Sequence, residues 1–159
     1  DLNISPRGWI APLLEIYRHC KPNTLRLYPD TRDLLKRWAK QYQLSMITDG
    51  YPQTQKNKID VLDISRYFSK IIFTHELGEN KKYKKPHPLA YEMMLSHYRI
   101  SPSQMIAVGD NPLVDFKGAV ALGIPCLRIL TGEFRRVRLP AEFSKNVYTV
   151  QTLSELGML

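Results

Sequence analysis

The chain has 159 residues, of which 43% are apolar and 24% are charged, so a single domain with a buried core is expected. No apolar run approaches the ~20 residues of a membrane-spanning helix, which argues against a membrane protein. The two cysteines, Cys20 and Cys126, lie far apart in the sequence. We expect reduced thiols rather than a disulfide or a metal pair, and therefore a cytoplasmic protein.

The net charge is +8 at pH 7. Basic residues are scattered, with local clusters only at 81–85 and at Arg135, Arg136 and Arg138. Because no basic helix stripe and no aromatic RNA-binding motif accompanies them, the charge favours a basic surface around a small anionic substrate. A basic α/β module that binds nucleic acid is the alternative.

The first half of the chain alternates helical patterns with short apolar runs. Asp30 suits the cap of a helix, and Pro52 suits the first position of another. The predicted elements here are helices over 12–19, 31–41 and 52–62 and strands over 44–47 and 71–74.

The second half continues the alternation, and Gly123 suits the C-terminal cap of a helix. The polar, basic segment 132–145 is expected to be an exposed loop. The predicted elements are helices over 89–98 and 112–122, strands over 105–108, 125–129 and 147–150, and a last helical turn over 152–156. This order predicts an α/β fold, a parallel sheet with helices on both faces.

Polar residues follow three of the predicted strands. Thr48-Asp49-Gly50 follows the first, Lys84-Lys85-Pro86-His87-Pro88 follows the second after a polar loop, and Gly109-Asp110-Asn111, with Asp115, follows the third. Ligand sites in parallel sheets lie at the carboxyl ends of strands. Two carboxylates on one turn are costly unless a cation or a polar network takes up their charge, so we expect a hard metal ion.

These three motifs, in this order, resemble the haloacid dehalogenase (HAD) superfamily of phosphohydrolases. Thr48 matches the family's second motif, Lys85 the third, and Asp110 with Asp115 the fourth. The resemblance runs from about residue 14 to residue 128 and implies a Rossmann-like core. Only 36 residues separate Thr48 from Lys85, so the implied cap is the helical kind that is inserted before Thr48.

The family's first motif, Asp-x-Asp after an apolar strand, has no clear counterpart. In the family its first Asp is the nucleophile and its second is the general acid/base. Asp1-Leu2-Asn3-Ile4-Ser5 is a faint echo, but no strand precedes it and Asn replaces the second acid. We therefore expect residues 1–24 to be the remnant of a helical cap, and residues 25–159 a HAD-like core lacking its first strand. A missing N-terminal segment, or another chain, would complete the sheet.

The resemblance assigns phosphoryl binding to four residues. Thr48 supplies a hydroxyl, and Gly50 lets its backbone N–H approach an oxyanion closely. Asp49 and Asn111 would add polar contacts to the substrate, although Asp49 could instead cap the next helix or orient a neighbour. An ordinary strand-to-helix turn is the alternative explanation for 48–50.

The resemblance assigns catalytic or metal-binding roles to Lys85, Asp110 and Asp115. Lys85 would neutralise the transferring phosphoryl group, with Lys84 as the alternative if the register shifts by one. Asp110 and Asp115 would organise Mg²⁺, and Asp115 could also hold Lys85. A helix cap at Pro112 would explain Asp110 but would leave Asp115 without a role.

The predicted function is Mg²⁺-dependent hydrolysis of a small phosphomonoester through an aspartyl-phosphate intermediate. The chain by itself is expected to be inactive, because the nucleophile would lie outside it. One alternative is a HAD-like module that binds a phosphate compound or a protein without catalysis. The other is the nucleic-acid module, whose affinity would fall steeply with salt.

Overall fold

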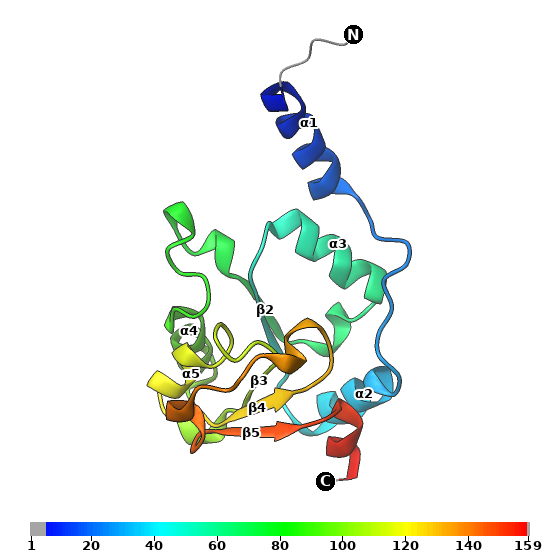
Figure 1. Cartoon of the computed structure of the whole chain (residues 1–159). Coiled ribbons are helices and arrows are strands. Elements are labelled where there is room, and N and C mark those ends of the chain that lie inside the picture. The colour runs from blue at the N-terminus through cyan, green and yellow to red at the C-terminus, as the bar shows by residue number, and fades with distance from the viewer. Residues whose placement is uncertain (1–5, 159) are drawn as a thin grey trace.

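The computed structural model describes residues 6–158 and has the expected α/β fold (Figure 1). Asp1-Leu2-Asn3-Ile4-Ser5 therefore lies outside the described residues. Of the helices within this range, none combines the length and apolar composition that crossing a membrane requires. The helices are α1 (Pro6–His19), α2 (Thr31–Gln41), α3 (Pro52–Leu62), α4 (Leu89–Tyr98) and α5 (Lys117–Ala121), and the strands are β1 (Ser45–Thr48), β2 (Lys70–Phe73), β3 (Ala107–Gly109), β4 (Cys126–Ile129) and β5 (Val147–Val150).

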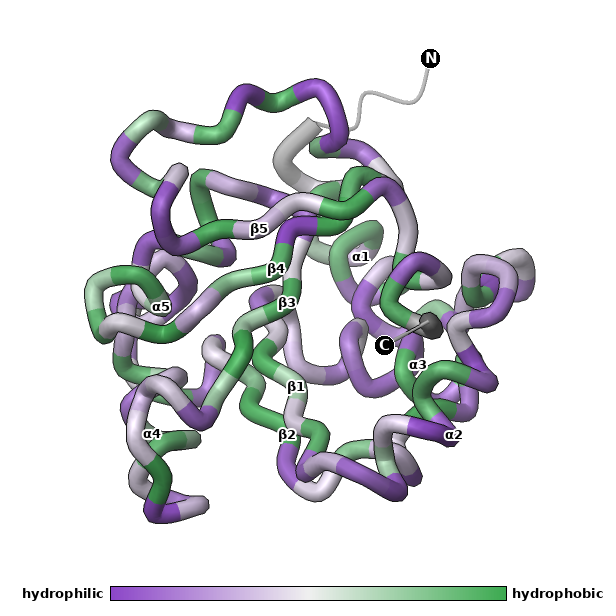
Figure 2. Tube along the Cα trace, turned by 90° about the horizontal axis from the view of Figure 1, so that it is seen from below, coloured by the Kyte–Doolittle hydropathy of each residue, from purple (hydrophilic) through white to green (hydrophobic). Residues whose placement is uncertain are grey.

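The strands form two parallel sheets. β1 pairs with β2, with Ser45 opposite Lys70. β3, β4 and β5 form the second sheet, in which Gly109 lies opposite Arg128. Figure 2 shows the strands in the spatial order β5, β4, β3, β1, β2. α3 connects β1 to β2 and α5 connects β3 to β4, whereas the connection from β4 to β5 contains only two short 3₁₀ turns, at Glu133–Arg136 and Ala141–Phe143.

The sheet is interrupted between β1 and β3. Within residues 6–158, β1 pairs as a strand only with β2, and β3 only with β4. The two strands are nevertheless close, because Ile47 of β1 packs against the core cluster that contains Ala107 of β3. Ile106 and Val108 leave 66% and 48% of their surface exposed. Unpaired strand edges that carry apolar side chains are places where another strand can pair.

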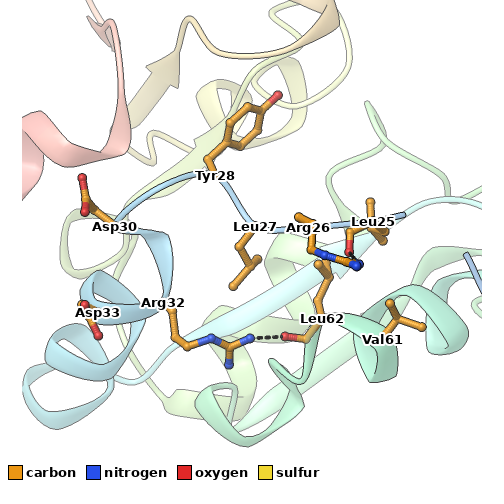
Figure 3. A pocket seen from close by; sticks show the side chains of 9 residues that line it. All are labelled: Leu25, Arg26, Leu27, Tyr28, Asp30, Arg32, Asp33, Val61 and Leu62. Carbon is orange, nitrogen blue, oxygen red and sulfur yellow. Dashed lines mark hydrogen bonds between the residues drawn. The ribbon is translucent and has the colours of Figure 1, made fainter. Parts of the chain in front are cut away.

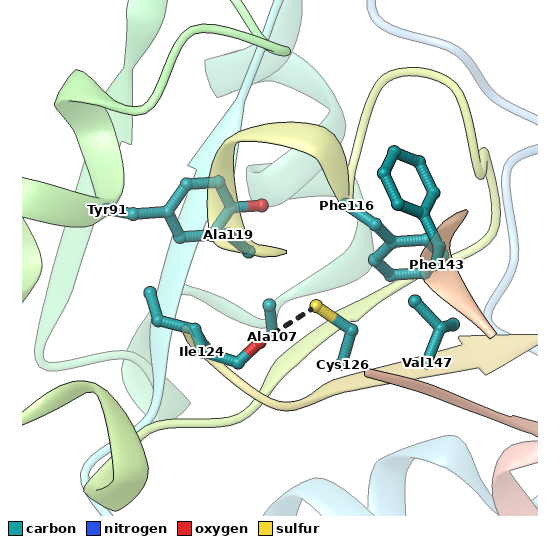
Figure 4. Packing of buried hydrophobic residues seen from close by; sticks show 8 residues of the cluster. All are labelled: Tyr91, Ala107, Phe116, Ala119, Ile124, Cys126, Phe143 and Val147. Carbon is teal, nitrogen blue, oxygen red and sulfur yellow. Dashed lines mark hydrogen bonds between the residues drawn. The ribbon is translucent and has the colours of Figure 1, made fainter. Parts of the chain in front are cut away.

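The largest core cluster packs α4, α5 and the segment before β5 against the second sheet (Figure 4). Each large apolar side chain buried in such a cluster stabilises the fold by about 1.5–3 kcal/mol. Phe143, which is 8% exposed, belongs to the basic segment 132–145, so that segment is anchored to the core and not a free loop. The buried members are Tyr91, Ala107, Phe116, Ala119, Ile124, Cys126, Phe143 and Val147.

α1 extends away from the body of the molecule and is attached at its C-terminal end (Figure 1). The side chain of Asn57 on α3 is buried, and its amide donates to the carbonyl oxygens of Arg18, His19 and Cys20 at 3.4, 3.1 and 3.2 Å. These carbonyls have no partner inside a helix that ends there. The exposed apolar side chains of α1 are Trp9, Ile10, Leu13, Leu14, Ile16 and Tyr17.

One predicted helix start and one predicted helix cap are wrong. The helix expected over 112–122 forms only as α5, because the Asp115 carboxylate accepts the backbone N–H groups of Asp110 and Asn111 and closes a tight loop instead. α2 begins at Thr31 as predicted, and Asp30 lies at its N-cap position, but the Asp30 side chain makes no capping hydrogen bond: its backbone is left-handed, with φ 61°, and its carboxylate accepts the hydroxyl of Ser154 at 3.2 Å. In both places an aspartate carboxylate accepts hydrogen bonds that are absent from the helix predicted from the local sequence.

Candidate active site

Three polar segments that follow β1, β2 and β3 meet in space. The Oδ1 atom of Asp49 accepts the backbone N–H of Lys85 at 3.2 Å. The ammonium of the same lysine donates to Oδ1 of Asp115 at 2.7 Å. The three motifs predicted from the sequence are therefore brought together, and Lys85 contacts one residue of each of the other two motifs.

The Lys85–Asp115 ion pair is largely shielded from water, since the two side chains are 15% and 12% exposed. The second oxygen of Asp115 accepts the backbone N–H groups of Asp110 and Asn111 at 3.1 and 2.9 Å. Both carboxylate oxygens are thus occupied, and charge-assisted bonds of this kind are the stronger class. Asp115 fixes the direction of the lysine and the shape of the loop at once.

Asp49 orients its neighbours. Besides the Lys85 N–H, its Oδ1 atom accepts the hydroxyl of Thr74, a residue that is 1% exposed and lies directly after β2. Sequence reasoning did not assign Thr74 a role, although a hydroxyl at the end of a predicted strand was a usable signal. The contact of Asp49 with substrate stays a prediction, whereas its contacts with the second and third segments are structural.

Thr48 and Gly50 form the turn after β1. The Thr48 hydroxyl donates to Oε1 of Gln55 at 3.2 Å. Gly50 has φ 113°, and a Cβ there would lie 2.6 Å from Nε2 of Gln55. This backbone conformation favours glycine, and a larger residue would also have to displace the Gln55 amide. Gln55 therefore lies beneath the turn, a position on α3 that the helical pattern alone did not mark as part of a site.

Asp110 differs from Asp115 in its surroundings. Among the side chains that the structure describes, none forms a hydrogen bond or an ion pair with its carboxylate. Burial raises the pKa of Asp110 above its ordinary value, and the negative charge of Asp115 raises it further. A nearby cation would offset both effects. Asn111, the fourth predicted contact, uses its Oδ1 atom to accept the N–H of Leu113 at 3.1 Å.

The donor set fits a magnesium ion that keeps most of its ligands as water and phosphate oxygens, because Mg²⁺ commonly takes only one or two protein carboxylates. Asp110 has the available carboxylate, whereas both oxygens of Asp115 already have partners. In the described part of the chain, no group of three or more His, Cys, Asp or Glu side chains gathers to form a complete metal cage.

Two further residues support Asp115 and its loop. The buried Tyr91 hydroxyl donates to the Asp115 carbonyl oxygen at 2.6 Å. Gly118 lies against the lysine loop, where a Cβ would come within 2.7 Å of the Pro86 carbonyl oxygen. Neither could be found from sequence spacing, since Tyr91 precedes Asp115 by 24 positions and nothing local links them.

A hollow of about 390 Å³ lies away from these three segments, between the connector before α2 and the end of α3 (Figure 3). The Arg32 guanidinium crosses it and donates to the Leu62 carbonyl oxygen at 2.8 Å. Its lining includes Leu25, Leu27 and Val61 but no residue of the three motifs. Tyr28 also lines the hollow, but its ring points away from the other lining residues (Figure 3).

The fold and the three converging motifs define the class of HAD-like hydrolases. The model for the family described as haloacid dehalogenase-like hydrolase matches residues 3–129, and the chain belongs to this family. The glyceraldehyde 3-phosphate phosphatase of Pyrococcus furiosus is 31% identical over 160 residues, covering 100% of this chain and 63% of the relative. The phosphoserine phosphatase of Thermus thermophilus is 29% identical over 99 residues, covering 62% and 38%. The chain thus spans less than two thirds of these relatives.

Solved structures show the same fold at low sequence identity. A predicted phosphoglycolate phosphatase from Haemophilus somnus superposes with a TM-score of 0.71 at 21% identity, covering 86% of this chain and 58% of that one. The HAD-hydrolase YfnB from Bacillus subtilis, described as bound to magnesium, gives 0.66 at 19% identity, covering 83% and 54%. Both resemblances establish the fold.

Proposed function

We propose that the protein of which this chain is part hydrolyses small phosphomonoesters in a Mg²⁺-dependent reaction. The observation that carries the proposal is the convergence of Thr48, Lys85 and Asp110 from three separate loops, with Lys85 fixed by Asp115 at 2.7 Å. The phosphatase names of several relatives support the choice of a phosphate ester as substrate.

In this proposal each residue has a defined task. Thr48 and the Gly50 N–H bind oxygens of the phosphoryl group, and the Lys85 ammonium neutralises the negative charge that develops on it. Asp110 holds Mg²⁺, which would screen the phosphoryl charge and orient the ester when bound. Asp49 and Asp115 position the lysine, Asp115 stays a candidate second carboxylate for organising Mg²⁺, and Asn111 stays a candidate substrate contact.

The nucleophile requires a carboxylate beside these groups. The interruption between β1 and β3 supports its delivery by one more strand, supplied by another segment of the protein or by another chain. A strand that paired with both edges in parallel would end between Thr48 and Asp110. An Asp at that end could attack phosphorus while the bond from phosphorus to the ester oxygen breaks and the alcohol leaves with a proton. Water then hydrolyses the aspartyl-phosphate, which releases inorganic phosphate and restores the carboxylate. The 159-residue chain alone is accordingly proposed to be inactive.

The remaining assignments are consistent with this function. Residues 1–24 are proposed to be the end of a helical cap, of which α1 is the described part. Cys20 is exposed and Cys126 is buried, and both thiols are free. Reduced thiols fit the cytoplasm, which we propose as the compartment.

The test is a phosphatase assay on the intact protein with p-nitrophenyl phosphate. Turnover should disappear in EDTA and return when Mg²⁺ is added. Binding of phosphate without turnover would indicate the non-catalytic binding module instead. Turnover that persists in EDTA would contradict the proposed Mg²⁺ dependence.

A further inference from the structure

A second hollow, of about 820 Å³, adjoins the candidate active site. Gly132 forms the shared wall, because a Cβ at this residue would lie 3.3 Å from Oδ2 of Asp110 and 3.7 Å from the Tyr28 hydroxyl. Its φ of 96° is a conformation that glycine adopts readily, so the backbone can pass close to the carboxylate. The lining residues are Tyr28, Leu130, Thr131, Gly132, Glu133, Arg135, Arg136, Gln151 and Thr152.

The lining is polar and carries two guanidinium groups against one carboxylate. Arg135 and Arg136 are exposed, and neither forms an ion pair with another residue of the described chain. The hydroxyls of Tyr28 and Thr131 and the amide of Gln151 add neutral hydrogen-bonding groups. Guanidinium groups recognise carboxylates and phosphates with paired N–H donors, so this surface suits an anion.

A buried arginine fixes the segment that carries these two residues. Arg128 on β4 is 5% exposed, and its Nη2 atom donates to the carbonyl oxygens of Phe134 and Val137 at 2.9 and 2.6 Å. Among the described residues no carboxylate pairs with Arg128, and its buried Nε has no hydrogen-bond partner. The positive charge beneath the segment is therefore not neutralised by the chain, which favours a negative ligand above it.

We propose that this hollow binds a second acidic group of the substrate, a carboxylate or a further phosphate, through Arg135 and Arg136. The inference rests on the proposed phosphatase function and narrows its substrate class to small phosphomonoesters with a second negative charge. The phosphoryl group would lie at Asp110, and the second acid would extend past Gly132. Arg128 is a positioning residue in this scheme, since its hydrogen bonds in the described chain go to backbone carbonyl oxygens of the loop.

The test compares three matched substrates in the intact protein. Ethyl phosphate has no second acid, phosphoglycolate adds a carboxylate, and ethanediol bisphosphate adds a phosphate. The Arg135→Gln/Arg136→Gln double variant should lose roughly tenfold to a hundredfold in kcat/KM for the acidic substrate that the hollow accepts, mainly through KM. The loss for ethyl phosphate should be much smaller. Arg138→Gln removes one charge from the same segment outside the hollow and is the control.

The outcomes separate the two proposals. Equal losses on all three substrates, or no loss on any, would overturn the second-acid site while leaving the phosphatase intact. If the intact protein turns over none of them, the phosphatase proposal fails. In that case calorimetric titration with phosphoglycolate still tests the second-acid site. The double variant must bind phosphoglycolate more weakly than Arg138→Gln does, and equal affinities would overturn the site. A double variant that loses affinity only for a 20-nucleotide RNA or DNA would also overturn it.

Discussion

The ammonium nitrogen of Lys85 lies 2.7 Å from Oδ1 of Asp115, and the backbone N–H of the same lysine donates to Asp49. One residue thus joins the loops that follow β1 and β3. Because the lysine is held at both its backbone and its side-chain end, its charge is oriented before any ligand binds. Such preorganised charges stabilise a developing anion without reorganisation during the reaction.

Replacing Lys85 by alanine in the intact protein should reduce phosphatase turnover about a hundredfold to a thousandfold, the usual range for one electrostatic donor. The decrease should appear in kcat more than in KM, since the charge acts mainly on the transition state. Steady-state kinetics on p-nitrophenyl phosphate measures both values. Lys84→Ala and Lys82→Ala remove the same charge from the same loop and should keep most activity. Equal losses in all three variants would mean that the loop is only a basic surface.

Substitutions at Asp110 and Asp115 should both reduce activity but should differ in their effect on the stability of the fold. Asp110→Asn should abolish Mg²⁺-restored activity but leave thermal stability unchanged or slightly higher, because burial and Asp115 already disfavour its ionised form. Asp115→Asn removes the partner of Lys85 and should also destabilise the protein, by about 1.5–3 kcal/mol for a lost charged hydrogen bond. Urea unfolding and activity assays on both variants check the contrast. Full activity in Asp110→Asn would end the assignment of Asp110 as the metal ligand.

A methyl group at Gly118 should displace the loop that carries Lys85. Its Cβ would lie 2.7 Å from the Pro86 carbonyl oxygen and 3.1 Å from Cα of Pro88, and neither backbone atom can move cheaply. We expect Gly118→Ala to cost roughly 1–3 kcal/mol and to lower activity as well. Gly123→Ala meets no atom within 4 Å but has φ 75°, so it should cost about 1–2 kcal/mol with activity retained. Similar activity losses in both variants would contradict this coupling.

The interrupted sheet should make the 159-residue chain depend on a partner strand. Unpaired edges at β1 and β3, with Ile106 and Val108 exposed, predict low solubility and a broad thermal transition for the chain alone. Co-expression with the segment that completes the sheet should sharpen the melt. Calorimetry and sedimentation of the two samples provide the comparison. A monomeric chain with a sharp cooperative melt and no partner would show that the edges need no strand.

The sequence predicted those features of the fold that depend on residues close together along the chain. The alternation of strand and helix patterns predicted the α/β fold. Polar residues at the ends of strands predicted that Thr48, Lys85 and Asp110 belong to one region. The failures lie where distant contacts override local preference. Asp115 prevents a helix from starting at Pro112 by accepting backbone N–H groups. The tyrosine that supports it, Tyr91, reaches it only through the tertiary fold.

The C-terminal end of α1 is joined to α3 by more than one side chain. The Asn57 amide has two hydrogens, yet three successive carbonyl oxygens lie 3.1–3.4 Å from its nitrogen. The Thr54 hydroxyl donates to the Arg18 carbonyl oxygen at 3.4 Å, and the Arg18 guanidinium lies 4.5 Å from the centre of the Tyr51 ring. Tyr51 directly follows Gly50, and α3 begins at the next residue. The attachment of α1 is therefore built on the same short stretch of chain that forms the Thr48–Gly50 turn.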